Sequence, residues 1–538
     1  MANIKKNFGY QIAYRILTVI TPLITSPIVS RALQADKLGV YSATYAYADY
    51  FVLLAMLGVA SYGQRTIAAA KTLEERQKLF WEIYTVQFVA SIVALSLYLL
   101  SLPIAALKVP DRIPVMLTQG LWIVSCIFSI SWFFFGIEEF RVTVIRNLFI
   151  KAIAISGIVL FIRKPEHLIW YTLIMAGGTF LSEAVLWISL SRRVKFEKSN
   201  WSRIKTHIIP IFRLFIPVVA MSVFHIMDKS MLDWLSTEEN VGWYYASDKI
   251  VNIPLGLILA VSTVVMSRMS YVMNNEGKDR AVRLLEKSAE LTVFLTSAVS
   301  FGVACIAVEF VPFFFGPGYE PCVNLLYMFL PVLLIKALGD IVRTQYMIPA
   351  KKDTLFIIAV IGGAVANVIC NLLFIPKLGA TGAVIGTLVA EATVLTIELS
   401  GCAREMNFVK IFAKQFPYII IGAAMAVVVR LFAHAVKLPK NYLQIGAMVL
   451  VGAAVYLLLC VLLWLFKKNS IFPAYAKSLY KRLARSKGRK SNENLIDETD
   501  EKEEQGEIAG NVESDTNVDK EETVRSGSRG NDSDFTET

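Results

Sequence analysis

The sequence predicts an all-α integral membrane protein of about 14 transmembrane helices, built from two pseudo-twofold-related six-helix lobes plus two extra C-terminal helices. Three observations support this fold class. Hydrophobic residues make up 55% of the 538 positions, and the mean hydropathy is +0.54. Apolar windows of membrane-spanning length recur along the chain, and the two halves share an internal repeat. This composition excludes an ordinary soluble protein.

The apolar windows are each about 20 residues long, which is enough to cross the hydrocarbon core. Fourteen are expected, at residues 10–30, 39–60, 80–102, 113–135, 144–162, 168–190, 208–234, 243–266, 291–315, 325–348, 355–376, 380–400, 416–436 and 443–466. An even number places both termini on one side. The connections on that side and the termini carry about 33 Lys and Arg, against about 9 on the other side. By the positive-inside rule both termini are predicted to be cytoplasmic.

The C-terminal region beyond the last span divides by charge. Residues 467–490 are strongly basic, a pattern typical of a juxtamembrane segment that binds anionic lipid headgroups. Residues 491–538 contain 16 acidic and 4 basic residues with few aromatics, and we expect this tail to be disordered. The tail either competes with lipid for the basic segment or acts as an inert solubilising extension.

Cysteine and histidine residues give no sign of a metal site or disulfide framework. The six cysteines have no C-x-x-C spacing, and the four histidines are isolated. We therefore expect no metal and no cofactor apart from an H⁺ or Na⁺ coupling ion. We also expect no nucleic-acid partner.

The repeat is clearest around two glycines. G-V-Y-S-A begins at Gly39 and is followed by Arg65, and G-W-Y-Y-A begins at Gly242 and is followed by Arg268, so both arginines come 26 residues after their glycine. We expect an N-terminal lobe at 1–200, a C-terminal lobe at 205–405 and two added helices at 416–466. Lobes in the same orientation predict a substrate site between them and alternating access as one lobe rocks against the other.

The seventh and eighth spans form a charged hairpin across the short polar turn 236–240. Asp228-Lys229 lies in the first of these spans and Asp248-Lys249 in the second. Ionisable side chains at membrane depth are costly, at roughly 2.5–3.5 kcal/mol each, so they usually face a wet cavity or one another. Prolines allow helices to bend, and the expected gating prolines are Pro22, Pro27, Pro210, Pro217 and Pro254.

Further charged residues lie inside other spans: Arg15, Asp49, Glu183, Glu309, Lys336, Asp340, Arg343, Glu391 and Arg430. Lys336, Asp340 and Arg343 are spaced to form one polar stripe along a helix, as the wall of a wet cavity would need. We interpret the cations as binding an anionic group of the cargo. The carboxylates Asp49, Asp228, Asp340, Glu183 and Glu391 balance those charges or exchange a coupling ion.

Structural roles remain open for several of these residues. Lys249, Arg343 and Arg430 are near enough to helix ends to extend toward headgroups. Asp340 could serve only to neutralise Lys336. Glu183 and Glu391, which are equivalent in the repeat, could be hydrogen-bonding residues between helices.

Two stretches resemble a known family. M-D-K-S-M-L-D-W-L-S-T-E-E-N-V-G-W-Y-Y-A-S-D-K-I at 227–250 and N-L-L-F-I-P-K-L-G-A-T-G-A-V-I-G-T-L-V-A-E at 371–391 resemble polysaccharide transporters, the O-antigen and capsule flippases. These belong to the multidrug/oligosaccharidyl-lipid/polysaccharide exporter superfamily. The resemblance covers roughly residues 5–466.

The resemblance implies a bacterial inner-membrane flippase, not an enzyme, that moves an undecaprenyl-diphosphate-linked oligosaccharide to the outer leaflet. A cationic central cavity would bind the diphosphate, with Arg15, Lys229, Lys249, Lys336 and Arg343 as its candidates and Arg65 and Arg268 at the cytoplasmic mouth. The two extra helices would shape a groove for the lipid tail. A polysaccharide polymerase and glycosyltransferases are the implied protein partners.

Two alternatives remain open, and a third is disfavoured. A peptidoglycan-precursor flippase has the same features. A cation-coupled multidrug exporter of the same fold would favour acids and aromatics in the cavity. A membrane polymerase or transferase would need a sizeable loop or domain, and the outer loops are too short for one.

Overall fold

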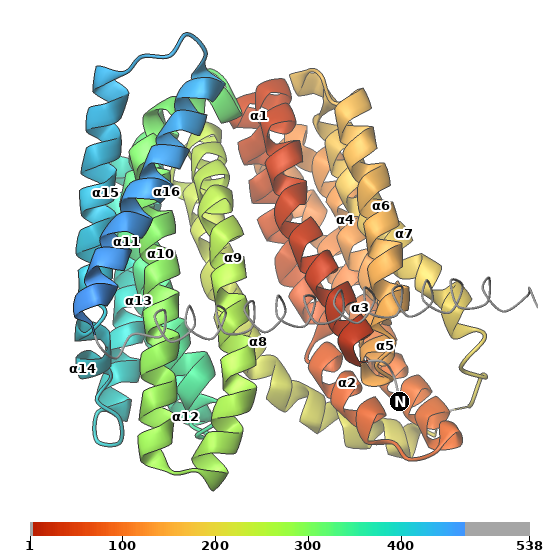
Figure 1. Ribbon diagram of the computed structural model, residues 1–538. Coiled ribbons are helices and arrows are strands. Elements are labelled where there is room, and N and C mark those ends of the chain that lie inside the picture. Colours follow the sequence, from red (N-terminus) through yellow and green to blue (C-terminus); the bar gives the residue numbers. More distant parts are fainter. Residues whose placement is uncertain (1–3, 199, 468–538) are drawn as a thin grey trace, which may run out of the picture. The chain divides into compact units, whose positions relative to one another are not determined.

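The computed structural model describes residues 4–198 and 200–467. The chain divides into two compact units, Met1–Lys468 and Asn469–Thr538, and the described residues belong to the first. The predicted acidic tail, and the basic segment apart from Lys467, therefore lie outside the described residues. Within the described residues every regular element is a helix, as the hydropathy pattern predicts (Figure 1).

The first half of the chain contains seven α-helices and two short 3₁₀ turns. They are α1 (Ile4–Met56), α2 (Val59–Ala69), α3 (Leu73–Lys108), η1 (Pro110–Arg112), α4 (Ile113–Phe128), α5 (Ser131–Gly136), α6 (Phe140–Phe161), η2 (Pro165–His167) and α7 (Leu168–Leu190). The long helices are apolar runs that end at turn signals. For example, Thr72 caps α3 by accepting a hydrogen bond from the Glu75 amide at 3.2 Å.

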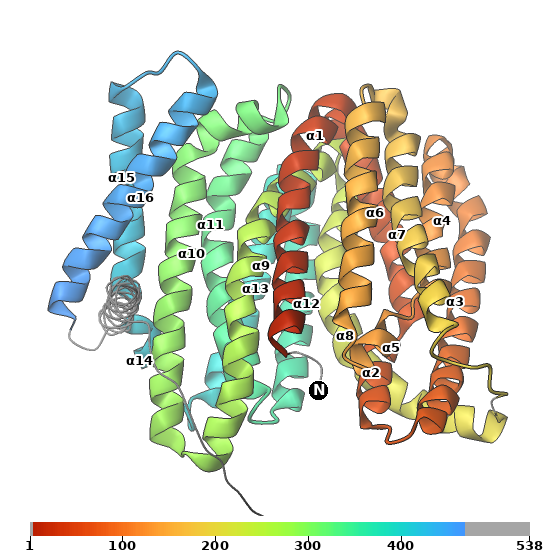
Figure 2. The same ribbon diagram turned by 45° about the vertical axis from the view of Figure 1, so that its right-hand side comes forward.

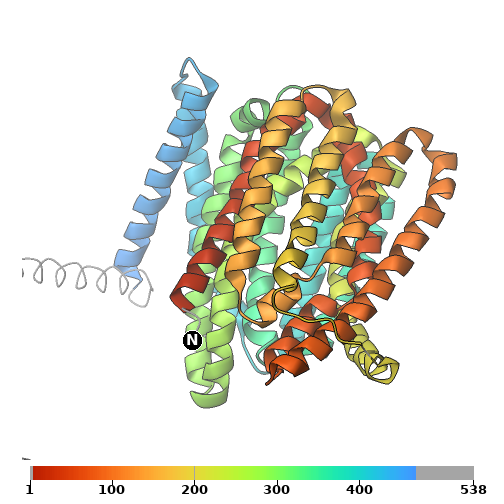
Figure 3. The ribbon, with the colours of Figure 1, turned by 90° about the vertical axis from the view of Figure 1, so that its right-hand side faces the viewer.

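The second half continues with α8 (Trp201–Leu235), α9 (Glu238–Asn275), α10 (Lys278–Phe315), α11 (Pro321–Asp340), the π-helix η3 (Ile341–Met347), α12 (Asp353–Leu378) and α13 (Ala380–Cys402). The short α14 (Phe408–Ala413) leads into α15 (Phe416–Ala435) and α16 (Asn441–Phe466). These last two helices pack on α10 and lie at the edge of the unit, away from α1–α7 (Figure 2, Figure 3).

The described residues contain 11 helices that are long and apolar enough to cross a membrane, or up to 12 if the bent pair within α9 counts as one span. The exact number of fourteen is therefore not reproduced. One difference is α1, a single element that contains the expected spans 10–30 and 39–60. The other is α8, which contains the expected span 208–234 and is partly outside the residues whose side chains are described.

The bend in α1 falls at Gln34, which has a φ of 61°. This left-handed conformation is unfavourable for a residue with a side chain, and it reverses the chain between the two expected spans. Figure 1 shows α2, α14 and the α9–α10 turn at the lower end of the unit and the α15–α16 loop at the upper end. These two ends are called lower and upper below.

Two repeat-equivalent glycines meet near the upper end. A Cβ atom on Gly39 would overlap with the Glu238 carbonyl oxygen, and one on Gly242 would overlap with the Ala35 carbonyl oxygen. Gly39 and Gly242 are 203 residues apart in sequence, and so are Ala35 and Glu238. The two contacts are therefore reciprocal, which is what a twofold relation between the α1 and α9 regions would produce.

Buried apolar side chains connect the halves differently at the two ends. At the upper end a single cluster includes Leu33 and Tyr171 of the first half with Tyr244 and Phe315 of the second. At the lower end two separate clusters occur, one around Phe80 and the other around α10, η3 and α14. Hydrophobic contact between the halves is therefore concentrated at the upper end.

Polar contacts reinforce the upper end. Arg112 donates to Asp233 at 2.7 Å and to Glu238 at 2.8 Å, which ties η1 to α8 and α9. Ser30 of α1 donates to the Phe315 carbonyl at 3.0 Å. Together with the glycine contacts, these bonds hold the two halves against each other at this end.

Helix α8 is shared between the two halves. Ile204 and Ile211 near its start pack into the lower cluster of α1–α7, whereas its last turns pack against α12. Figure 1 shows the start of α8 crossing the lower end of the first half. Pro210 lies within the first of these contact regions, next to Ile211, and Pro217 follows it in the chain.

Candidate functional site

The charged residues of the α8–α9 hairpin surround one tyrosine ring. The Nζ atoms of Lys229 and Lys249 lie 5.5 and 5.3 Å from the ring centroid of Tyr245. The Lys229 Nζ also lies 3.6 Å from an Asp248 carboxylate oxygen, and both side chains are 20% exposed. Asp49 of α1 interacts electrostatically with Lys229. These five residues are called the Tyr245 cluster. Lys229, Lys249 and Asp49 are predicted site residues, and Asp248 belongs to the charged hairpin.

Lys249 differs from Lys229 in its partners. Among the described residues no carboxylate lies within 4.0 Å of its Nζ, whereas Lys229 is paired with Asp248. A partly exposed cation against an aromatic ring is well placed to accept an anionic ligand.

Asp228 is next to Lys229 in sequence but faces another direction, because adjacent residues of an α-helix are rotated by about 100°. Its carboxylate is buried and accepts four hydrogen bonds. Asn367 and Asn371 donate at 2.8 and 2.7 Å, and Tyr244 and Thr387 donate at 2.9 and 2.7 Å. Asp228 therefore joins α8, α9, α12 and α13, and its buried charge is fully hydrogen-bonded.

The predicted stripe on α11 pairs with α13. The Lys336 Nζ lies 3.8 Å from Glu391, and the Arg343 guanidinium donates to Glu398 at 3.0 Å. The Glu391 side chain is nearly buried and that of Glu398 is completely buried. These two ion pairs form a ladder between α11–η3 and α13.

Lys336 pairs with Glu391, and among the described residues no ion pair within 4.0 Å joins Lys336 to Asp340. The Asp340 carboxylate instead accepts a hydrogen bond from Thr344 at 2.7 Å. The π-helix η3 follows immediately and widens the helical turn. Arg343 consequently lies over the ring of Phe356 and against α13, and the stripe does not continue as a regular α-helical face.

Glu183 lies in a polar network of the first half. One carboxylate oxygen lies 3.6 Å from Arg146, and the other accepts a hydrogen bond from Ser131 at 2.9 Å. Arg146 and Ser182 both donate to the side-chain oxygen of Asn147, at 2.9 and 2.7 Å. Glu183 therefore ties α7 to α5 and α6.

A cavity of about 480 Å³ adjoins this network, between α1, α4, α6, α7 and α9. We call it the first-half cavity. Among the side chains that line it are Pro22, Tyr41, Tyr45, Trp122, Asn147, Lys151, Tyr171, Ser182, Glu183, Tyr245 and Lys249. Tyr245 and Lys249 thus belong both to this cavity and to the Tyr245 cluster.

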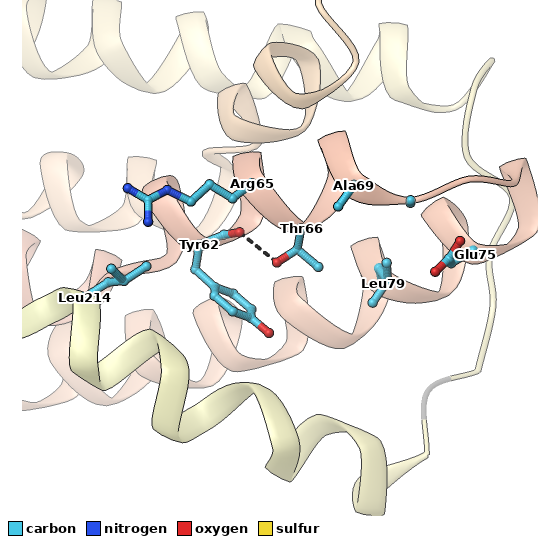
Figure 4. Close-up of a pocket in the computed structure, with 8 residues that line it drawn as sticks. Tyr62, Arg65, Thr66, Ala69, Glu75, Leu79 and Leu214 are labelled. Carbon is cyan, nitrogen blue, oxygen red and sulfur yellow. Dashed lines mark hydrogen bonds between the residues drawn. The ribbon is translucent and has the colours of Figure 1, made fainter. Parts of the chain in front are cut away.

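Arg65 lies in a different cavity, of about 470 Å³, at the lower end. Figure 4 shows it on α2 with Tyr62 and Thr66, and α3 and α8 complete the lining. The Tyr62 hydroxyl is bonded to His207 at 2.7 Å, and His207 is bonded to Glu82 at 3.0 Å. This buried chain fixes the start of α8 to α2 and α3.

The Arg268 side chain lies at the α9–α10 turn, also at the lower end. It donates to one oxygen of Glu276 at 2.6 Å, while Arg280 donates to the other at 2.9 Å. The hydrogen bond from Arg280, together with Arg268, lowers the pKa of the Glu276 carboxyl. Arg65 and Arg268 therefore both lie at the lower end, on separate elements.

The remaining predicted residues have varied positions. The side chains of Arg15 in α1 and Pro217 in α8 lie outside the described residues. Pro27 lies in α1. Pro254 lies just before a 42° bend between Glu238–Gly256 and Val261–Asn275 of α9.

Three residues of these networks are missing from the predicted site: Glu398, Arg146 and Lys151. Glu398 follows Glu391 by seven residues, and Arg343 follows Lys336 by the same number. Two helices with equal spacing of opposite charges can form two ion pairs, so this spacing is a usable signal. Arg146 and Lys151 lie within the expected span 144–162, where their charge alone marks them as unusual.

Comparison with known proteins places the chain in a family. The family model described as "Polysaccharide biosynthesis protein" matches residues 4–273. A protein assigned as an O-antigen transporter in Shigella dysenteriae is 23% identical over 391 residues, which cover 70% of this chain and 94% of that protein. Another with the same assignment, in Escherichia coli strain K12, is 19% identical over 64% of this chain and 84% of its own length.

Solved structures agree on the fold. The lipid II flippase MurJ in an inward closed conformation matches with a TM-score of 0.65 at 16% identity, over 85% of this chain and 98% of MurJ. An inward-facing multidrug resistance MATE transporter of the MOP superfamily matches with a TM-score of 0.56 at 13% identity, over 75% of this chain and 98% of its own. The chain belongs to the polysaccharide biosynthesis protein family, and it is a multi-pass membrane transporter rather than an enzyme.

Proposed function

We propose that this protein moves an undecaprenyl-diphosphate-linked oligosaccharide from the inner to the outer leaflet for surface polysaccharide biosynthesis. The relatives assigned to O-antigen transport and the MurJ-like fold support a lipid-linked glycan as the cargo. The distribution of Lys and Arg favours a cytoplasmic lower end.

The observation that carries the proposal is the Tyr245 cluster. It places two lysines around one ring on helices of membrane length, where α8 and α9 meet α1. Lys249 provides a cation without a carboxylate partner among the described residues. Lys229 provides a second cation that an anionic ligand can take over from Asp248. Two cations held at one tyrosine ring suit a diphosphate.

Binding of a diphosphate must compete with the internal ion pairs of the lysines. Lys229 and Lys336 are each paired with a carboxylate in this arrangement. A diphosphate must replace Asp248 or Glu391 at those lysines, so its binding exchanges one anion for another. A ligand shifts a conformational equilibrium only through its different affinity for the two states. Exchange of partners supplies that difference, because it breaks contacts between helices.

The displaced carboxylates are the proposed coupling groups. Once separated from their lysines, Asp248 and Glu391 are anions at membrane depth and favour uptake of H⁺ or Na⁺. The sequence predicts this role for Glu391 but not for Asp248. Asp49 and Asp228 are further candidates from that prediction, and Asp228 already has a complete set of hydrogen-bond donors. Glu183 and Asp340 remain charge-balancing candidates.

Access from alternate sides follows from the contacts between the halves. They are concentrated at the upper end, around the Gly39–Glu238 and Gly242–Ala35 contacts. We propose that these contacts separate as the lower ends come together, with Pro254 and the α8 prolines at the bending positions.

A cavity beside the extra helix α15 supports the proposal that this part of the protein binds the lipid tail. This cavity of about 430 Å³ lies between α10, α11 and α15, and its lining is mostly apolar: Phe301, Ala304, Cys305, Tyr327, Leu330, Ala426, Val427, Arg430 and Leu431. Arg430 is paired with Glu309 there, at 2.8 Å. Such a groove is suited to a polyprenyl chain whose headgroup lies inside the protein.

The test is export in cells that depend on this protein for surface polysaccharide. Lys229→Ala and Lys336→Ala should each remain in the membrane at normal abundance and abolish outer-leaflet appearance of the lipid-linked glycan. Lys108→Ala, which removes an exposed lysine at the end of α3, is the matched control and should export normally. Normal export by both Lys229→Ala and Lys336→Ala would contradict the cationic-site mechanism. If these variants export the surface polysaccharide normally but lose transport of the peptidoglycan precursor or efflux of drugs, the result would point to the alternative cargoes.

A further inference from the structure

We propose that the first-half cavity binds the pyranose ring of the sugar that is attached directly to the diphosphate. This inference rests on the proposed function and assigns a separate place to one part of the cargo. The cavity is lined by four helices of the first half and by α9. Its volume of about 480 Å³ is within the usual range for a small-molecule site.

The lining has the chemistry that a sugar ring requires. A pyranose has two faces of C–H groups and a rim of hydroxyl groups. Tyr45 and Trp122 both line this cavity, with ring centroids 5.2 Å apart and planes inclined by 75°. Aromatic surfaces of this kind contact C–H faces, while polar groups bind the rim. Asn147, Ser182 and Glu183 of α6 and α7 also line the cavity and provide those polar groups.

One of the aromatic residues has unused hydrogen-bonding capacity. The indole N–H of Trp122 is buried and has no acceptor among the described residues. A buried donor normally finds a partner, because an unmade hydrogen bond is costly. A sugar hydroxyl bound beside Trp122 would be a suitable acceptor after a small rotation of the side chain.

The position of the cavity matches the order of groups in the cargo. Tyr245 and Lys249 line the cavity, and the Lys229 Nζ lies 5.5 Å from the centroid of the same tyrosine ring. A diphosphate held by Lys229 and Lys249 would therefore have the cavity directly beside it. The group bonded to the diphosphate in a lipid-linked oligosaccharide is the first sugar, and it is the group that would enter.

Gly178 allows the cavity to be filled without disturbing its walls. It lines the cavity from α7, and a Cβ atom there would meet only Ala154 Cβ at 3.8 Å and Ile150 Cγ2 at 4.0 Å. These are ordinary van der Waals distances. An alanine therefore fits, while a leucine extends into the space that the sugar would use.

The experiment measures binding of two probes to the full-length protein in lipid nanodiscs. The probes are a polyprenyl diphosphate without sugar and the same lipid carrying one N-acetylglucosamine, titrated by calorimetry. We expect the wild type to bind the sugar-bearing probe about tenfold more tightly, a difference of about 1.4 kcal/mol. Gly178→Leu should lose this preference and keep its affinity for the sugar-free probe, whereas Gly178→Ala should match the wild type.

A second pair of variants guards against a folding defect in Gly178→Leu. Trp122→Leu should also lose the preference for the sugar-bearing probe. Trp170→Leu, which removes an indole that is 61% exposed on α7, should not. Equal binding of both probes by the wild type would overturn the sugar site alone, as would a preference that survives in Gly178→Leu and Trp122→Leu. Equal weakening of both probes by Gly178→Leu would also overturn it, by showing that the cavity binds the lipid diphosphate. Failure of the wild type to bind either probe would overturn the proposed function as well.

Discussion

At the scale of residues, lysines and arginines at membrane depth are held by carboxylates from neighbouring helices. Lys229, Lys336 and Arg343 have Asp248, Glu391 and Glu398 as partners. Each pair lowers the cost of placing charge within the membrane. The same pairing makes the cations conditional binding groups, because an anionic cargo must compete with a side chain that is already there.

The Arg343–Glu398 pair gives a prediction about stability. Glu398 is completely buried and its partner is largely so. Removal of one member of a buried pair leaves an uncompensated charge and typically destabilises by about 3–5 kcal/mol. Glu398→Ala should therefore lower the melting temperature of the purified protein by several degrees, as measured by intrinsic fluorescence.

The double variant provides the control. Arg343→Met in the Glu398→Ala background removes the unpaired charge and should recover most of the lost stability. If Glu398→Ala melts like the wild type, or if the double variant is less stable than the single one, the pair is not a structural element of the α11–α13 contact.

The sequence could predict the cations but not their partners. Charge inside an apolar window is visible in one dimension, and Lys229, Lys249, Lys336 and Arg343 are all found from it. The choice of Glu391 over Asp340 as the partner of Lys336 depends on how α13 packs against α11. The uncharged donors to Asp228 were also out of reach, because Asn367 and Asn371 have no unusual pattern until α12 lies beside α8.

At the scale of elements, apolar length predicts the helices well and their boundaries less well. The expected spans 168–190, 380–400 and 416–436 agree with α7, α13 and α15 within two residues. The π-helix at 341–347 and the bend at Gln34 are not predictable from hydropathy. Both depend on local backbone geometry that neighbouring helices impose.

The two close-packed glycines give a prediction about the upper contact. Gly39→Ala places a methyl group against the Glu238 carbonyl oxygen, and neither backbone can yield without moving its helix. We expect it to shift the population toward an arrangement in which the upper ends are apart. Spin labels on the α3–α4 and α12–α13 turns should then report longer distances by pulsed electron spin resonance.

Two further variants make this test specific. Gly242→Ala, the reciprocal substitution, should have the same effect because it meets the Ala35 carbonyl oxygen. Gly302→Ala on α10 has open space around its Cβ position and should leave the distances unchanged. Unaltered distances in both Gly39→Ala and Gly242→Ala would show that these contacts do not hold the upper end together.

At the scale of the whole molecule, the unit described here is joined at one end and separately packed at the other. A single apolar cluster includes both halves at the upper end, whereas the lower end has one cluster for each half. The repeat of G-V-Y-S-A and G-W-Y-Y-A indicated matching halves from sequence. It could not indicate that the two glycines contact each other's regions, or that the start of α8 packs with the first half.

The most direct measurement of the central claim is translocation by the purified protein. Proteoliposomes containing polyprenyl-diphosphate-linked N-acetylglucosamine in both leaflets are treated with a membrane-impermeant galactosyltransferase that modifies only accessible glycan. If the protein moves this lipid between leaflets, nearly all of the glycan should become modified. Modification that stops at the fraction initially in the outer leaflet, as in protein-free liposomes, would contradict the account.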